Sequence, residues 1–141
     1  MLSSVSLDLI PPAFQRSYDA IAAFAQGPVS DVIPAIERAI ATHVDPEALF
    51  LFGLLLIRVD AGERGLEVLG GAVRAGYTPA STLGHNRAFD AVRERESFKA
   101  IQAEAKRRML AAQATFEAAG GPEMLGLPAA TRLASPLPKT L

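Results

Sequence analysis

Hydrophobic residues along this chain recur at intervals of three and four positions, the spacing of α-helices that bury one face. One face of the first such segment is formed by Phe14, Tyr18, Ile21 and Ala25. No segment shows the convincing alternation of a half-buried strand, so the chain is predicted to be all-α. The longest segment carries a continuous apolar stripe, formed by Phe98, Ile101, Ala105, Met109, Ala112, Phe116 and Ala119.

Start and stop signals divide the chain into short helices joined by short turns. Pro12 suits the first helical position, and Gly27-Pro28 is expected to end that helix. Asp45 is predicted to cap a third helix that begins at Pro46. Ser30 is predicted to be the N-cap of a second helix, with Pro34 in its opening turn, and Gly76 the C-cap of a fourth helix over about 63–75. Asn86 is predicted to cap a short helix over about 87–93. Gly120-Gly121-Pro122 is expected to end a long helix over about 97–119.

The segment Ala48–Ile57 is apolar at all positions but one. A helix that is hydrophobic all round is normally buried, so one interpretation makes this the central helix of the core. In the other interpretation, Phe50, Leu54 and Ile57 line an open face that binds an apolar peptide or a second copy of the protein. Arg58 would then lie at the rim of that face. Both interpretations stay open at this point.

Helices joined by such short turns are expected to pack as antiparallel neighbours, that is, as stacked hairpins. The segment 46–79 resembles a tetratricopeptide (TPR) repeat, a helix hairpin of about 34 residues. Small residues in this pattern let the two helices approach closely, and a large residue fills the groove between them. The matching positions are Leu49, Phe52, Gly53, Leu56, Gly65, Leu69 and Ala72, with departures at Leu49, where Trp is usual, and at Tyr77, where the closing Pro is usual.

The segment 76–127 is similar to the C-terminal end of bacterial TPR proteins, through Gly76-Tyr77, Leu83, Asn86 and the Phe98 that leads the last helix. This resemblance implies a short right-handed solenoid of antiparallel hairpins, closed by a long helix that serves as a solubilising cap. The expected organisation is an N-terminal extension over 1–11, one domain over 12–127 with hairpins at about 12–44 and 46–76, and a mobile tail over 128–141.

Composition limits the classes of function. The chain has 141 residues, 14 Lys and Arg against 15 Asp and Glu, and no Cys. This balance excludes a generally basic nucleic-acid-binding protein, and the lack of Cys excludes thiol catalysis and thiolate metal sites. Residues 1–10 lack the basic start of a secretory signal, and Ala48–Ile57 is about half the length that spans a bilayer. We therefore expect a cytoplasmic protein without membrane or nucleic-acid partners.

No group of residues in the sequence has the spacing of a catalytic, metal or cofactor site. His43 and His85 lie far apart and lack ligand or base–nucleophile spacing. The glycines of 62–76 lack a phosphate-loop ending, so Gly70-Gly71 is better explained by close helix contact or by a groove. Lys106-Arg107-Arg108 is interspersed with glutamates, which indicates a solvated helix face with ion pairs between neighbouring turns.

The sequence therefore favours a non-enzymatic TPR-type scaffold without cofactor or metal. Its expected partner is a protein or peptide, or a second copy of the chain bound through the same apolar helix. The alternative is a regulatory domain that binds a small apolar ligand between the third and the last helix.

Overall fold

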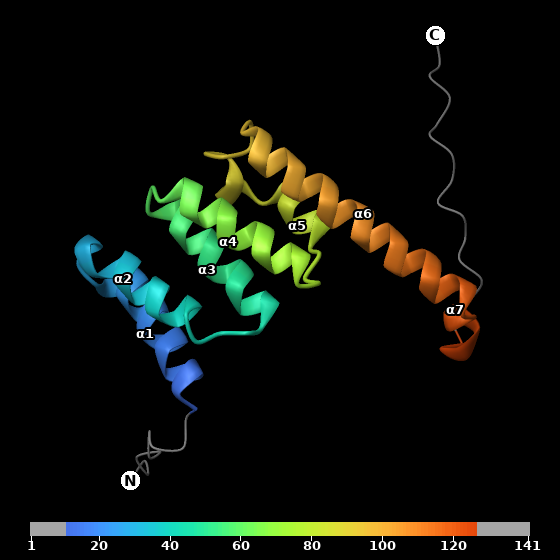
Figure 1. Cartoon of the computed structure of the whole chain (residues 1–141), viewed down its shortest axis with the longest axis horizontal. Coiled ribbons are helices and arrows are strands. Elements are labelled where there is room, and N and C mark those ends of the chain that lie inside the picture. Colours follow the sequence, from blue (N-terminus) through green and yellow to red (C-terminus); the bar gives the residue numbers. More distant parts are fainter. Residues whose placement is uncertain (1–10, 127–141) are drawn as a thin grey trace.

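Residues 11–126 are described by a computed structural model, and within this range the chain is helical without a β-strand (Figure 1). The prediction of an all-α fold is confirmed. The predicted extension and tail lie almost wholly outside the described residues. The helices are α1 (Pro12–Gln26), α2 (Val29–Ile40), α3 (Pro46–Arg58), α4 (Gly62–Arg74), α5 (Ala80–His85), the 3-10 turn η2 (Arg87–Phe89), α6 (Glu96–Ala118) and α7 (Gly121–Met124).

Helices α3 and α4 pack closely against each other, and two glycines make this possible. A Cβ atom at Gly53 would lie 2.9 Å from Leu69 Cγ and 3.0 Å from the Gly65 carbonyl oxygen. A Cβ atom at Gly65 would lie 2.7 Å from the Gly53 carbonyl oxygen. Any side chain at either position would therefore separate the helices, because real Cβ atoms do not approach other atoms so closely.

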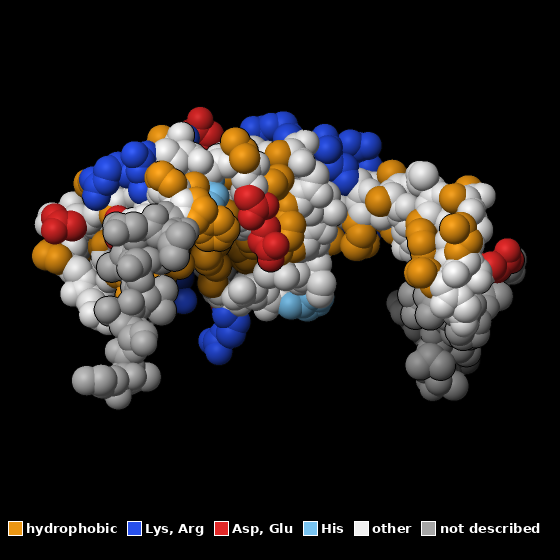
Figure 2. All heavy atoms as spheres, turned by 90° about the horizontal axis from the view of Figure 1, so that it is seen from below, with side chains coloured by type: hydrophobic (Ala, Val, Ile, Leu, Met, Phe, Trp, Pro, Cys, Tyr) orange, Lys and Arg blue, Asp and Glu red, His pale blue; other side chains and the backbone are white. Residues whose placement is uncertain are grey.

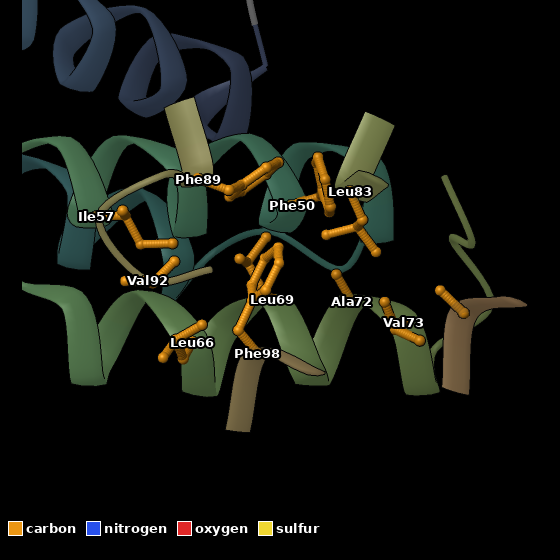
Figure 3. Packing of buried hydrophobic residues seen from close by; sticks show 11 residues of the cluster. Phe50, Ile57, Leu66, Leu69, Ala72, Val73, Leu83, Phe89, Val92 and Phe98 are labelled. Atoms are coloured by element: carbon orange, nitrogen blue, oxygen red, sulfur yellow. The ribbon is translucent and has the colours of Figure 1, made fainter. Parts of the chain in front are cut away.

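Helix α3 lies between two clusters of buried side chains. Phe50 and Ile57 join one cluster with α4, α5, η2 and the first turns of α6, while Phe52 and Leu56 join the other with α1 and α2. Figure 3 shows the first cluster, with Leu69 of α4 near its middle. Most of the surface of α3 therefore agrees with the interpretation that it is the central helix of the core.

Two predicted helix boundaries agree with the structure for the expected chemical reason. The Asp45 carboxylate accepts a hydrogen bond from the Glu47 backbone N–H at 3.2 Å and caps α3. Gly76 follows α4 with a φ of 111°, a conformation that favours glycine at a helix end. The Asn86 side chain caps as predicted, but it caps the short turn η2 and not a helix that reaches Arg93.

Other boundaries correct the sequence prediction. The N-cap of α2 is Pro28 and not Ser30, whose hydroxyl instead donates to the Asp31 carboxylate at 3.1 Å. Pro34 consequently lies inside α2 beyond its first turn, where it cannot donate a hydrogen bond to the Ser30 carbonyl. Helices α5 and α7 were not predicted. Both are short, and α7 begins directly after Gly120, which adopts a φ of 72°.

The segment after α5 is irregular because one side chain holds its backbone. The Arg93 guanidinium donates hydrogen bonds at 2.9 Å to the carbonyl oxygens of Gly84 and Asn86. It also pairs with the Asp90 carboxylate at 2.9 Å. These contacts favour a sequence of tight turns over a continuous helix between α5 and α6.

Helix α6 differs between its two ends (Figure 1). Its first turns pack on α4 and α5 and bury Phe98 and Ala105 completely. Its last turns extend away from the other helices and end at α7. We refer to residues 109–126 as the arm. No helix among residues 11–126 has both the length and the apolar character needed to span a bilayer.

Candidate binding hollow beside α3

A hollow lies beside the N-terminal half of α3. Its apolar walls come from Ala48, Phe50, Leu51 and Leu54 of α3 and from Tyr77, while Asp45 and Glu47 contribute carboxylates. Figure 2 shows hydrophobic side chains around a concave region in the middle of this face, with acidic groups beside it. The hollow is open to solvent, and it therefore fits part of a larger partner better than an enclosed small ligand.

Local helix geometry brings these side chains together. Residues 47, 50, 51 and 54 follow each other at steps of three, one and three, and so they lie on one side of α3. The Phe50 ring meets the rings of Tyr77 and Phe89 edge to face, with centroids 5.3 and 6.0 Å apart. These aromatic contacts fix the inner wall of the hollow against the core.

The rim of the hollow is negatively charged. Within residues 11–126, neither Asp45 nor Glu47 forms an ion pair with a basic side chain. Partial burial raises the pKa of the Tyr77 hydroxyl, and the nearby carboxylates of Glu47 and Asp45 raise it further. Tyr77 therefore stays neutral beside these carboxylates, and a cation is the partner group that suits them.

The structure separates the four residues predicted to form a binding face. Leu54 is half-buried and lines the hollow. Phe50 also lines the hollow, although only 6% of this residue is exposed. Ile57 is buried in the core. Arg58 lies 5.8 Å above the Phe24 ring, and it is absent from the residues that line the hollow.

Sequence reasoning missed the groups that complete the hollow. Tyr77 was noted only as a departure from the repeat pattern, and Asp45 and Glu47 only as signals for a helix start. A signal was present for Glu47, because it precedes Phe50 and Leu51 by about one helical turn and therefore shares their side of the helix. The position of Tyr77 could not be read from that pattern, since it depends on how the chain turns after α4.

The histidines have structural surroundings. His43 Nε2 is hydrogen-bonded to the Ser17 hydroxyl and lies 3.2 Å from the Ala13 carbonyl oxygen, so it ties the loop before α3 to α1. Its ring packs between Phe14 and Phe52. His85 Nδ1 lies 3.0 Å from the Ser81 carbonyl oxygen. Among residues 11–126, no three His, Asp or Glu side chains gather as a metal site would require.

A second hollow lies between α4 and α6, lined by Gly70, Val73, Ile101 and Arg108 among others. It is formed by α4 and the last helix, whereas the sequence placed a ligand site between the third helix and the last. A Cβ atom at Gly70 would lie 3.1 Å from Nη1 of Arg74, the flexible end of a side chain on the same helix, and 3.6 Å from Ile101 Cδ1, while one at Gly71 would meet nothing within 4 Å. Close helix contact thus explains Gly53 and Gly65 but not Gly70-Gly71.

The basic cluster on α6 is largely engaged in local ion pairs, as the sequence indicated. Arg107 and Arg108 both contact the Glu104 carboxylate, at 2.7 and 2.5 Å. Their hydrogen bonds lower the pKa of Glu104 to about 2. Lys106 forms no ion pair within the described part of the chain.

Comparison of this chain with protein-family models, with curated proteins and with solved structures found no match. Its function is therefore argued from the geometry of the hollow and the surface around it.

Proposed function

We propose that this chain is a non-enzymatic protein-interaction module, built from TPR-like helix hairpins, that binds an apolar segment carrying a basic residue. The observation that carries the proposal is the hollow beside α3, where an apolar wall adjoins the carboxylates of Asp45 and Glu47, which form no ion pair within residues 11–126. An apolar partner side chain would remove Leu51 and Leu54 from water. An adjacent Lys or Arg would then lie near the carboxylates.

The close α3–α4 crossing supports the repeat-like part of the proposal. A TPR hairpin requires small residues where its helices cross, and Gly53 and Gly65 meet within such a crossing here. The acidic rim also argues against a site for peptide C-terminal carboxylates, because like charges repel. The open shape favours a protein segment over the alternative, a small apolar ligand.

A pair of labelled peptides tests the proposed chemistry. One fluorescein-labelled peptide carries two leucines followed by two arginines, and the other replaces the arginines with glutamates. We expect fluorescence anisotropy to show at least about tenfold tighter binding of the arginine peptide, because each rim contact contributes a modest charge-dependent free energy. Equal binding of the two peptides, or binding of neither, would contradict the proposal.

Two matched substitutions locate the binding site. Leu51 is 39% exposed and lines the hollow, and Ile33 is 38% exposed and lies on α2 outside it. Leu51→Arg should abolish binding of the arginine peptide, whereas Ile33→Arg should leave it unchanged. Circular dichroism should show both variants folded, because both positions already reach solvent. Loss of binding in Ile33→Arg, or its survival in Leu51→Arg, would place the peptide elsewhere.

A further inference from the structure

The apolar stripe of α6 continues past the point where the domain covers it. Phe98 and Ala105 on this stripe are fully buried. In the arm the same stripe is formed by Met109, Ala112, Phe116 and Ala119, and all four are exposed, Met109 to 38% and Phe116 to 43%. One side of the Phe116 ring packs on Gly121 of α7, but within residues 11–126 the rest of this stripe is left uncovered, outside the α3 hollow and the proposed peptide site.

The charges along α6 are distributed unevenly between the base of the arm and its end. Lys106, Arg107 and Arg108 lie at the base, where Glu104 is the neighbouring acid. Between residues 109 and 126 the charged residues are Glu117 and Glu123, both acidic. Figure 2 shows basic side chains where the arm leaves the domain and acidic ones near its end.

The order of large and small residues on the stripe is self-complementary. Two copies of the arm, antiparallel and related by a two-fold axis near residue 114, would place Met109 opposite Ala119 and Ala112 opposite Phe116. Each large side chain then faces a small one, which lets two helices approach closely. A parallel arrangement would instead place Phe116 opposite Phe116 and the acidic ends side by side.

We propose that the arm is a homodimerisation surface, in which the outer half of α6 packs antiparallel against the same segment of a second copy. This arrangement brings the acidic end of each arm to the basic base of the other, twice in one symmetric contact. The contact between the two arms is centred outside the helical domains, so the two domains lie at opposite ends of the dimer.

A matched pair of alanine substitutions tests the surface. Ala112 lies on the stripe, while Ala111, which is also exposed, lies about 100° away round the helix. Ala112→Glu would bury an unpaired charge in the contact, and sedimentation velocity should show the dissociation constant of the dimer raised at least about 100-fold. Ala111→Glu should leave the dimer intact. A wild-type chain that stays monomeric at about 100 µM, where a dimer of micromolar affinity would be largely formed, or equal effects of the two variants, would overturn the proposal.

Charge exchange tests the antiparallel direction. The base variant Lys106→Glu/Arg108→Glu and the end variant Glu117→Lys/Glu123→Lys should each dimerise about tenfold more weakly, because each brings like charges together in both halves of its own dimer. Mixing the two variants pairs opposite charges in both halves and should restore dimers of wild-type stability. A mixture that stays as weak as its components would exclude the antiparallel contact. Circular dichroism of each variant separates a loss of helix from a loss of association.

Discussion

The α3–α4 hairpin and the arm of α6 have similar apolar patterns but opposite surroundings. Both carry hydrophobic residues at helical spacing, and both include phenylalanine and small residues. In the hairpin, Phe52 is 1% exposed and the helices touch through Gly53 and Gly65, whereas in the arm Phe116 is 43% exposed. The comparison teaches that periodicity identifies which face of a helix is apolar, while neighbouring elements decide whether that face is covered.

The largest expected contrast is between the two phenylalanines. Phe52→Ala should lower the free energy of unfolding by about 3–5 kcal/mol, because it removes a buried ring and leaves a cavity. Phe116→Ala should lower it by only about 1 kcal/mol, since Phe116 is 43% exposed and packs on Gly121 of the short helix α7 outside the two core clusters. Urea unfolding would measure both, each introduced into the Ala112→Glu background so that dimer formation does not contribute. Equal losses would mean that the arm is part of the cooperative core.

The two classes of glycine in α4 provide the next contrast. Gly65→Ala should lower the free energy of unfolding by about 1–3 kcal/mol, because its Cβ would collide with the α3 backbone. Gly71→Ala should raise it by up to about 1 kcal/mol, because nothing lies within 4 Å of the added Cβ and alanine is the better helix former. Thermal or urea unfolding of the two variants would show the opposite signs. A stabilising Gly65→Ala would contradict the close crossing.

Ion pairs extend the comparison at a smaller scale. Arg64 of α4 bonds Glu37 of α2 through two contacts, 2.8 and 3.0 Å long, and so joins two helices. Hydrogen bonding to Arg64 lowers the pKa of Glu37, so its contribution is complete above the ordinary pKa of a glutamate and is lost as pH falls through the lowered value. Because both side chains are more than a third exposed, Glu37→Gln should cost only about 0.5–1 kcal/mol at pH 7.

The control for that pair is Glu104, whose partners lie one turn away on α6 itself. Glu104→Gln should change global stability less than Glu37→Gln, because a local pair does not join separate elements. Urea unfolding at pH 7 and at pH 3 would compare the two variants with the wild-type chain. The difference between wild-type and Glu37→Gln should shrink at the lower pH, and a constant difference would show that the carboxylate charge is not what stabilises the pair.

Much of the helical order could be predicted, and the reasons for the failures are physical. The limits of α1 and the cap of α3 follow from Pro12, Gly27 and Asp45, which act within a few residues of their own position. The prediction of Ser30 as N-cap was wrong because a proline before the helix, here Pro28, can begin it without a side-chain cap. The predicted apolar face of α1 is exposed, since Ala20 and Phe24 on another side pack against the neighbouring helices.

The candidate site was predicted only in part. Phe50 and Leu54 do line a hollow, but Ile57 belongs to the core and Arg58 packs over α1. The carboxylate rim and the Tyr77 wall come from segments before and after the hairpin. Their meeting depends on the turn at Gly76 and on the packing of η2 beneath Phe50, which no local pattern encodes.

By itself, the sequence determined that the chain is helical, where most helices begin and end, and that two glycines allow α3 and α4 to meet. These properties depend on backbone hydrogen bonds, caps and side-chain volume over a few residues. Only the tertiary structure decided which apolar faces are covered and which charges surround the hollow. Burial depends on contacts between residues far apart in the chain, and a helix with one apolar stripe is compatible with several neighbours or with none.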